Sequence, residues 1–136
     1  MLCDRVLIPD RVIAEVARGK SKDPSAPATL QWAGRFATRD VDVLNFVAGW
    51  DLGAGESQVI SLCHRVESIR AVLDDGEARR CAATLAIPMI GTLGVLLQAK
   101  KRGFIPEARP VAESLLRNGL YFDRALLEQA LAACGE

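Results

Sequence analysis

The sequence predicts a mixed α/β fold in which short buried strands alternate with helices. The clearest evidence lies between residues 71 and 101. Residues 71–73 are apolar and strand-like, residues 76–85 have helical spacing, residues 87–90 form a second apolar stretch, and an apolar helix follows at about residues 93–101. Elements that alternate in this order form parallel sheets, so we expect a βαβα unit here. Open parallel sheets bind ligands in the crevice at the carboxyl ends of their strands.

The composition is typical of a single globular domain whose cysteines are reduced. The chain has 136 residues, half of them apolar, and its 17 basic and 17 acidic residues cancel, so any binding of nucleic acid must be local. The four cysteines form no CxxC pair, which predicts free thiols and a cytoplasmic protein. No apolar run approaches the roughly 20 residues of a membrane span, so we expect a soluble protein with no membrane partner.

The first elements are predicted to be a buried strand at residues 6–8 and a helix up to Arg18. Pro9 and Asp10 are expected to end the strand, and Gly19 to stop the helix. Glu15 lies on this helix, where a solvated surface acid is the commoner interpretation before any resemblance is considered.

The next part of the chain predicts a loop, an extended segment and two helices. Residues 20–28 have loop composition, residues 32–38 fit an extended segment, and residues 41–48 fit a short helix. A glycine-rich connection at residues 50–55 then opens a helix from Glu56 to about Val66. A carboxylate in the first turn of a helix, such as that of Glu56, is favoured by the free backbone amides there. The two glycines before Glu56 permit a ligand to approach the backbone closely, although GxG alone is a weak signal for phosphate binding.

Two adjacent carboxylates, Asp74 and Asp75, follow the strand at residues 71–73. They are therefore expected to point into the crevice at the carboxyl end of the sheet. Either aspartate could instead cap the helix that follows, and Glu77 completes a pattern like a capping box. Because an N-cap needs only one carboxylate, one aspartate is free to cap while the other reaches a ligand.

The remaining candidates for chemistry are weak. Cys63 and His64 adjoin on a helix without a second histidine or cysteine at ligand spacing, which argues against zinc, and no GxSxG elbow supports acyl transfer.

Two final helices are expected at about residues 107–118 and 124–134, the second capped by Asp123.

Four stretches together resemble one family. They are LGAGES at 52–57, VLDDGEARR at 72–80, IPMIGTLGVLLQAKKRGFIP at 87–106 and LIPDRVIAEV at 7–16. In this order they resemble PIN-domain proteins, specifically the PIN-like predicted nucleic-acid-binding proteins that accompany toxin–antitoxin operons. The likeness covers nearly the whole chain.

The resemblance implies a fold, a reaction and a site. The fold would be a single PIN-like domain over residues 1–136, a three-layer α/β/α sandwich with a small, mainly parallel sheet. The activity would be metal-dependent endonucleolytic cleavage of single-stranded RNA, using Mg²⁺ or Mn²⁺, with a cognate antitoxin protein as partner. Carried over by motif, the metal-binding and catalytic acids would be Glu15, Glu56 and Asp74, with Asp75 beside it. Hard divalent cations prefer such carboxylate oxygens.

The sequence also departs from the family pattern. Family members begin with a strand that ends in a (D/N)TS-like motif and a helix before they reach the segment that begins here at Met1. We therefore expect an N-terminally short domain whose remaining apolar surface is covered by a homo-oligomer or by a changed sheet order. The same departure raises an alternative function, a PIN-like binding or interaction subunit that does not cut RNA.

Overall fold

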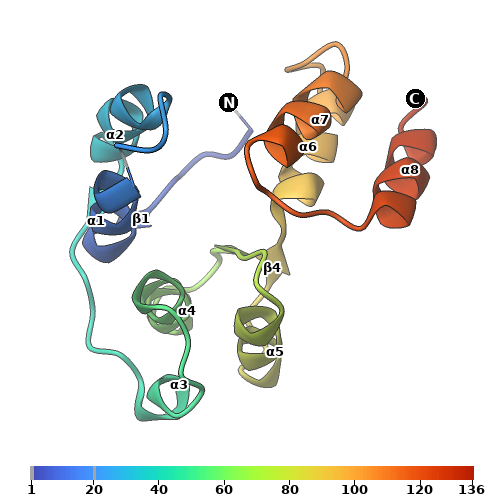
Figure 1. Ribbon diagram of the computed structural model, residues 1–136. Coiled ribbons are helices and arrows are strands. Elements are labelled where there is room, and N and C mark those ends of the chain that lie inside the picture. The colour runs from blue at the N-terminus through green and yellow to red at the C-terminus, as the bar shows by residue number, and fades with distance from the viewer. Residues whose placement is uncertain (1, 20) are drawn as a thin grey trace. The chain divides into compact units, whose positions relative to one another are not determined.

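Figure 1 shows the computed structural model of the chain, which describes residues 2–19 and 21–136. The fold is mixed α/β with short strands in small sheets, as predicted. The elements of the first part of the described chain are β1 (Ile8–Pro9), α1 (Asp10–Gly19), α2 (Ala26–Gly34), β2 (Ala37–Thr38), α3 (Asn45–Ala48) and α4 (Ala54–Arg65). Those of the second part are β3 (Ala71–Val72), α5 (Gly76–Thr84), β4 (Met89–Ile90), α6 (Thr92–Lys101), α7 (Arg109–Arg117) and α8 (Arg124–Ala133).

The strands pair in two small sheets. β1 pairs with β2 in parallel, with Ile8 opposite Ala37 and Pro9 opposite Thr38. β3 pairs with β4, and the amide of Ala71 donates to the carbonyl of Pro88 at 2.9 Å. Pro9 was expected to end the first strand but lies within β1. A proline is tolerated in a strand that pairs along one edge, because its missing N–H then breaks no ladder.

The described residues divide into two compact units. The N-terminal unit comprises residues 5–89, and the C-terminal unit comprises residues 90–136 with residues 2–4. That residues 1–136 form a single domain stays a prediction.

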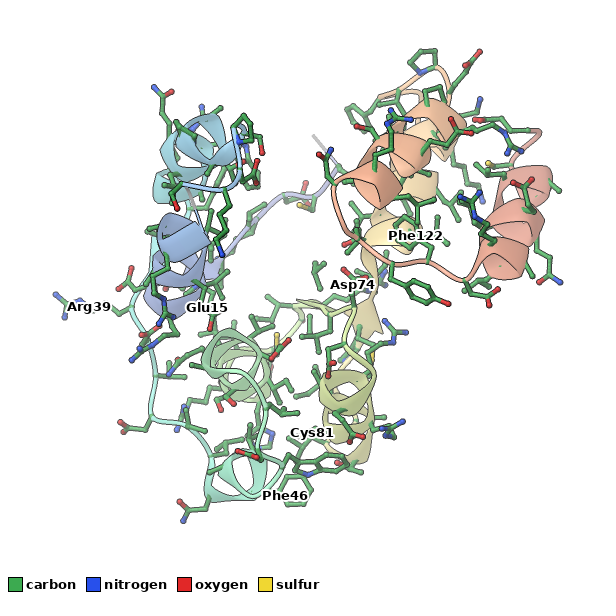
Figure 2. All side chains as sticks on the ribbon, viewed as in Figure 1. Glu15, Arg39, Phe46, Asp74, Cys81 and Phe122 are labelled. Carbon is green, nitrogen blue, oxygen red and sulfur yellow. The ribbon has the colours of Figure 1, made fainter. Side chains whose placement is uncertain are left out.

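The N-terminal unit has an apolar core between α4, α5 and β3. Ile60 of α4 and Ala78 of α5 are fully buried there, and Cys81, labelled in Figure 2, lies in the same cluster. The other buried members are Val47, Ala71, Leu73, Ala82 and Ile87. The helical spacing of the apolar residues on α4 and α5 therefore packs both helices against β3, and this packing fixes the position of Glu56 at the start of α4.

Two predictions for the region between residues 20 and 38 need correction or restriction. The expected extended segment at residues 32–38 is wrong over its first half, because α2 continues to Gly34 and only residues 37 and 38 form a strand. The helix begins with a proline in its first turn and buries Ala26 and Ala33, so packing outweighs the extended preference suggested by the aromatic residues. In the loop expected at residues 20–28, Lys20 lies outside the described residues, and α2 already begins at Ala26.

The helix expected at residues 41–48 forms only at its end, as α3. Residues before it are held by side chains of α4 instead. Gln58 accepts from the amide of Val41 and donates to its carbonyl, both at 2.8 Å, and the amide of Leu44 donates to the hydroxyl of Ser61 at 3.2 Å. These bonds occupy backbone groups that a longer helix would need, which explains the short helix.

The other helices match their predictions to within a few residues. α1, α4, α5, α6, α7 and α8 all form, and the predicted cap of α8 is present, since the carboxylate of Asp123 accepts from the amide of Leu126 at 2.8 Å. Within the described residues, no helix is both long and apolar enough to cross a bilayer.

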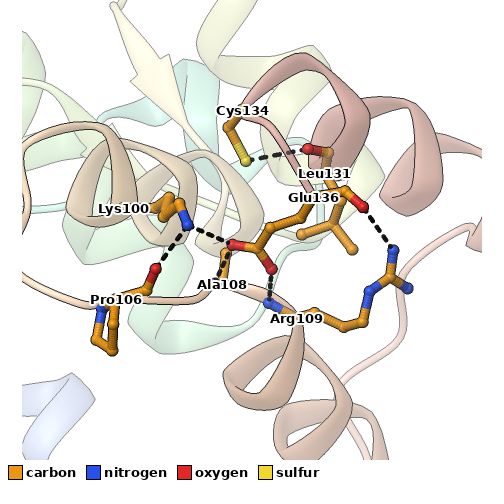
Figure 3. A network of polar contacts seen from close by, with 7 residues as sticks. All are labelled: Lys100, Pro106, Ala108, Arg109, Leu131, Cys134 and Glu136. Atoms are coloured by element: carbon orange, nitrogen blue, oxygen red, sulfur yellow. Dashed lines mark hydrogen bonds and ion pairs between the residues drawn. The ribbon is translucent and has the colours of Figure 1, made fainter.

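The C-terminal unit packs α6, α7 and α8 around a second apolar cluster. Leu96, Phe122 and Leu131 are buried in it. Beside this cluster, the carboxylate of Glu136 accepts from the amides of Ala108 and Arg109, at 2.6 and 2.9 Å, and lies 3.0 Å from Lys100 Nζ (Figure 3). Glu136 thus joins the start of α7 to the end of α6.

This contact predicts an acid-sensitive contribution to the stability of the C-terminal unit. The hydrogen bonds from the amides of Ala108 and Arg109, with a smaller contribution from Lys100, lower the pKa of Glu136 from 4.5 to about 2. Because folding lowers this pKa, the ionised carboxylate stabilises the folded chain at pH values above 4.5, its ordinary pKa. This stabilisation is lost as pH falls from 4.5 towards 2. We expect Glu136→Gln to lower the urea midpoint at pH 6, and the difference from wild type to shrink near pH 2.

The matched control is Glu113→Gln, which neutralises an exposed glutamate on α7. It should leave the urea midpoint nearly unchanged at both pH values, because surface charges contribute little. A Glu136→Gln difference that stayed constant between pH 6 and pH 2 would show that the carboxylate charge is not the source of the effect.

Candidate acidic site

Glu15 projects from α1 towards the first turn of α4 (Figure 2). Its Oε1 atom accepts from the amide of Gly55 at 2.9 Å, across 40 positions of the sequence. A Cβ atom placed on Gly55 would lie only 2.6 Å from Glu15 Oε2. Glu15 is exposed, as the surface interpretation expected, and its carboxylate also rests on the free amide end of a helix, where negative charge is favoured.

Glu56 is the third residue of α4, as the sequence predicted to within two residues. Its carboxylate folds back over the N-cap residue Gly53, where a Cβ atom would collide with Glu56 Oε2. A glutamate at this position commonly reaches back to the N-cap residue of its own helix. Gly53 and Gly55 thus admit two carboxylates to the backbone that opens α4, whereas the sequence alone suggested space for a ligand.

Asp74 and Asp75 lie at the junction of β3 and α5, where the change of pattern predicted them. The carboxylate of Asp75 accepts from the amide of Ala78 at 2.9 Å and caps α5. The sequence left open which of the two aspartates caps the helix, and the structure shows that Asp75 does so. Asp74, labelled in Figure 2, is exposed and precedes it. Arg79 secures the same junction by donating to the carbonyl of Leu73 at 2.9 Å.

The four acids therefore lie at two places, with two acids at each. The carboxylates of Glu15 and Glu56 lie against Gly55 and Gly53, and Asp74 and Asp75 adjoin after β3. Among the described residues, no group of three or more histidine, cysteine, aspartate or glutamate side chains is arranged to hold a metal ion. That the four acids share one metal site stays a prediction.

The contact between Glu15 and Gly55 is the feature that sequence reasoning missed. The only signal was the pair of glycines immediately before Glu56, in Gly-Ala-Gly-Glu. A glycine pair at a helix start indicates that something approaches the backbone closely, but it does not say what approaches.

A hollow in the N-terminal unit is lined by a thiol that is not reactive. It has a volume of about 510 Å³, and Cys63, His64 and Arg70 are among its lining residues. Burial raises the pKa of the Cys63 thiol to about 11, so the thiol is protonated at neutral pH and is a poor nucleophile and metal ligand. All four cysteines of the chain are free thiols, at positions 3, 63, 81 and 134.

Comparison with known proteins gives the family. The PIN domain family matches the chain over residues 1–136. The chain belongs to the PIN domain family. No curated protein and no solved structure matches it significantly. The predicted family is therefore confirmed, and with it a nucleic-acid-binding nuclease fold of the α/β class.

PIN domains usually use divalent metal ions, and the acids of this chain meet that requirement in part. Their donor chemistry fits, since Mg²⁺ and Mn²⁺ favour carboxylate oxygens. Their arrangement fits in part, because Glu15 and Glu56 both lie at the start of α4, but no three such side chains gather within the described residues.

Proposed function

We propose that this PIN domain is a metal-dependent endoribonuclease of toxin type that cleaves single-stranded RNA. The observation that carries the proposal is that the carboxylates of Glu15 and Glu56 both lie against residues 53–55 at the start of α4, since these are two of the acids that the family motifs assign to the site. Asp74 is proposed as the third metal-binding carboxylate. Asp75 was assigned to the same set, and its bond to Ala78 supports a role in fixing the junction that carries Asp74.

A Mg²⁺ or Mn²⁺ ion bound by these carboxylates would activate a water molecule and neutralise charge on the phosphate. Residues of the chain hold the carboxylates in place. The Gly55 amide orients Glu15, and the helix start orients Glu56. The proposal also places the protein in the cytoplasm, with an antitoxin protein as partner and a homo-oligomer as its working form.

The test is cleavage of single-stranded RNA by the purified chain in Mg²⁺ and in Mn²⁺. We expect internal cuts that stop in EDTA and resume when metal is restored. Intact RNA under all of these conditions would contradict the nuclease proposal.

A second function, nucleic-acid binding without cleavage, is favoured by a specific observation. No described group of three acids is arranged to hold a metal, and Asp75 is already used as a helix cap. A binding subunit would retain RNA in EDTA with undiminished affinity and would leave it uncut in Mg²⁺ or Mn²⁺. The cleavage assay therefore separates the two functions directly.

Gly55→Ala is expected to lower cleavage while leaving the fold intact. The new methyl group would lie 2.6 Å from Glu15 Oε2 and 3.1 Å from Glu15 Cδ, so the carboxylate must swing away from α4. Displacement of a metal-binding side chain or its supporting contact costs about 10-fold in activity or more. Alanine is otherwise a better helix residue than glycine, by roughly 0.5–1 kcal/mol, so stability should not fall. Cleavage rates and thermal unfolding measure the two effects separately.

Gly76→Ala is the matched control, because it places a methyl group in the first turn of α5 with no atom within 4 Å. It should leave cleavage unchanged. Equal activity of Gly55→Ala and wild type would show that the position of the Glu15 carboxylate does not matter to the reaction.

A further inference from the structure

Two aromatic pairs of the N-terminal unit present rings to solvent. On α2, Trp32 contacts Phe36 with ring centroids 5.1 Å apart, and Trp32 is 46% exposed. On α3, Phe46 contacts Trp50 with centroids 6.3 Å apart, and Phe46 is 50% exposed. Single exposed apolar residues are ordinary on a protein surface, so the chemistry beside each pair decides whether its rings can bind a ligand.

The sequence segments that contain the two pairs carry charges of opposite sign. Between residues 16 and 39 the sequence has one acidic residue, Asp23, and five basic ones, which are Arg18, Lys20, Lys22, Arg35 and Arg39. Between residues 40 and 51 it has three acidic residues and no lysine or arginine. A polyanion is therefore attracted to the segment of Trp32 and repelled from the segment of Phe46.

The cations near Trp32 are not used up by ion pairs within the described residues. The ion pairs there involve other cations, namely Arg11, Arg80, Lys100 and Arg109. Asp23 is held by Ser25 through bonds of 2.7 and 2.8 Å. Arg35 lies over the Phe36 ring, 5.9 Å from its centroid, and Figure 2 shows Arg39 projecting outwards from the unit.

We propose that Trp32, Phe36 and Arg35 form a stacking platform for the bases of a single-stranded nucleic acid, with Arg18, Lys22 and Arg39 beside its phosphates. Bases stack on exposed aromatic rings, and guanidinium groups add both stacking and charge. A duplex keeps its bases stacked on one another and cannot use such rings. The platform rests on the proposed function and deepens it, because α2 packs on α1, the helix that carries Glu15.

The experiment measures binding of fluorescein-labelled oligouridylate to the full chain by anisotropy in EDTA, where metal-dependent cleavage is blocked. We expect Trp32→Ala to weaken binding on the order of 10-fold, as loss of one stacked base does, and Trp32→Phe to restore most of the affinity. Arg39→Ala should flatten the dependence of log affinity on log salt by about 0.7, as loss of one phosphate contact does on a single strand.

Phe46→Ala is the control, since it removes an equally exposed ring from a sequence segment without lysine or arginine and should leave binding unchanged. Circular dichroism confirms that each variant folds. If Trp32→Ala binds like wild type, if Phe46→Ala weakens binding as much, or if polyglutamate competes as well as oligouridylate, the platform is overturned in favour of simple charge attraction or an acidic protein partner. A chain that cuts no RNA but loses binding on Trp32→Ala would disprove the nuclease and uphold the platform.

Discussion

Glu56→Gln is expected to reduce RNA cleavage by at least about 100-fold while the protein stays folded. Glutamine has the same shape, but its neutral amide is a far weaker ligand for Mg²⁺ or Mn²⁺ than a carboxylate. Loss of a ligand shifts the cation and its water, and a displacement of about 1 Å costs on the order of 100-fold in rate. The position at the start of α4 tolerates the change, because the charge contributes only about 0.3–1 kcal/mol there. Initial cleavage rates with saturating Mn²⁺ measure the effect.

Glu77→Gln is the matched control for this experiment. Glu77 is also a glutamate in the first turn of a helix, but it is exposed on α5 and forms an ion pair with Arg80. The same chemical change there should leave cleavage at the wild-type rate. Full activity of Glu56→Gln, or equal losses in both variants, would remove Glu56 from the reaction.

Local sequence patterns predicted most helices and their caps because the deciding interactions span only a few residues. Asp75 and Asp123 accept from amides three positions ahead, so the cap and its partner lie within one stretch of sequence. The strands were predicted less well. β1 and β2 are two residues long, and their pairing joins positions 29 residues apart, so their bounds depend on tertiary contacts that no local pattern contains.

The candidate site shows the same limit. The motif order placed Glu56, Asp74 and Asp75 at element junctions, and the structure has them there. The partner of Glu15 could not be predicted, because the amide of Gly55 comes from a different helix. α2 was missed for a related reason. Trp32 and Phe36 favour an extended prediction by their residue type, but burial of Ala26 and Ala33 decides for a helix.

Ile60→Ala is expected to lower the free energy of unfolding of the N-terminal unit by about 2–5 kcal/mol. Ile60 is 0% exposed and packs in the cluster formed by α4, α5 and β3, so its truncation leaves a cavity as well as losing apolar contacts. The effect bears on function, since Ile60 lies one turn beyond Glu56 and holds the same helix in place. Urea unfolding followed by far-UV circular dichroism measures it.

Val72→Ala is the comparison for this core substitution. Val72 is also a β-branched residue of the N-terminal unit, on β3, but its side chain is 54% exposed. Its truncation should change the free energy of unfolding by about 0.5 kcal/mol or less. If the two variants unfolded at the same urea concentration, Ile60 would not lie in a closed core. The start of α4, against which the carboxylates of Glu15 and Glu56 lie, would then lack the packed support that the proposed metal site requires.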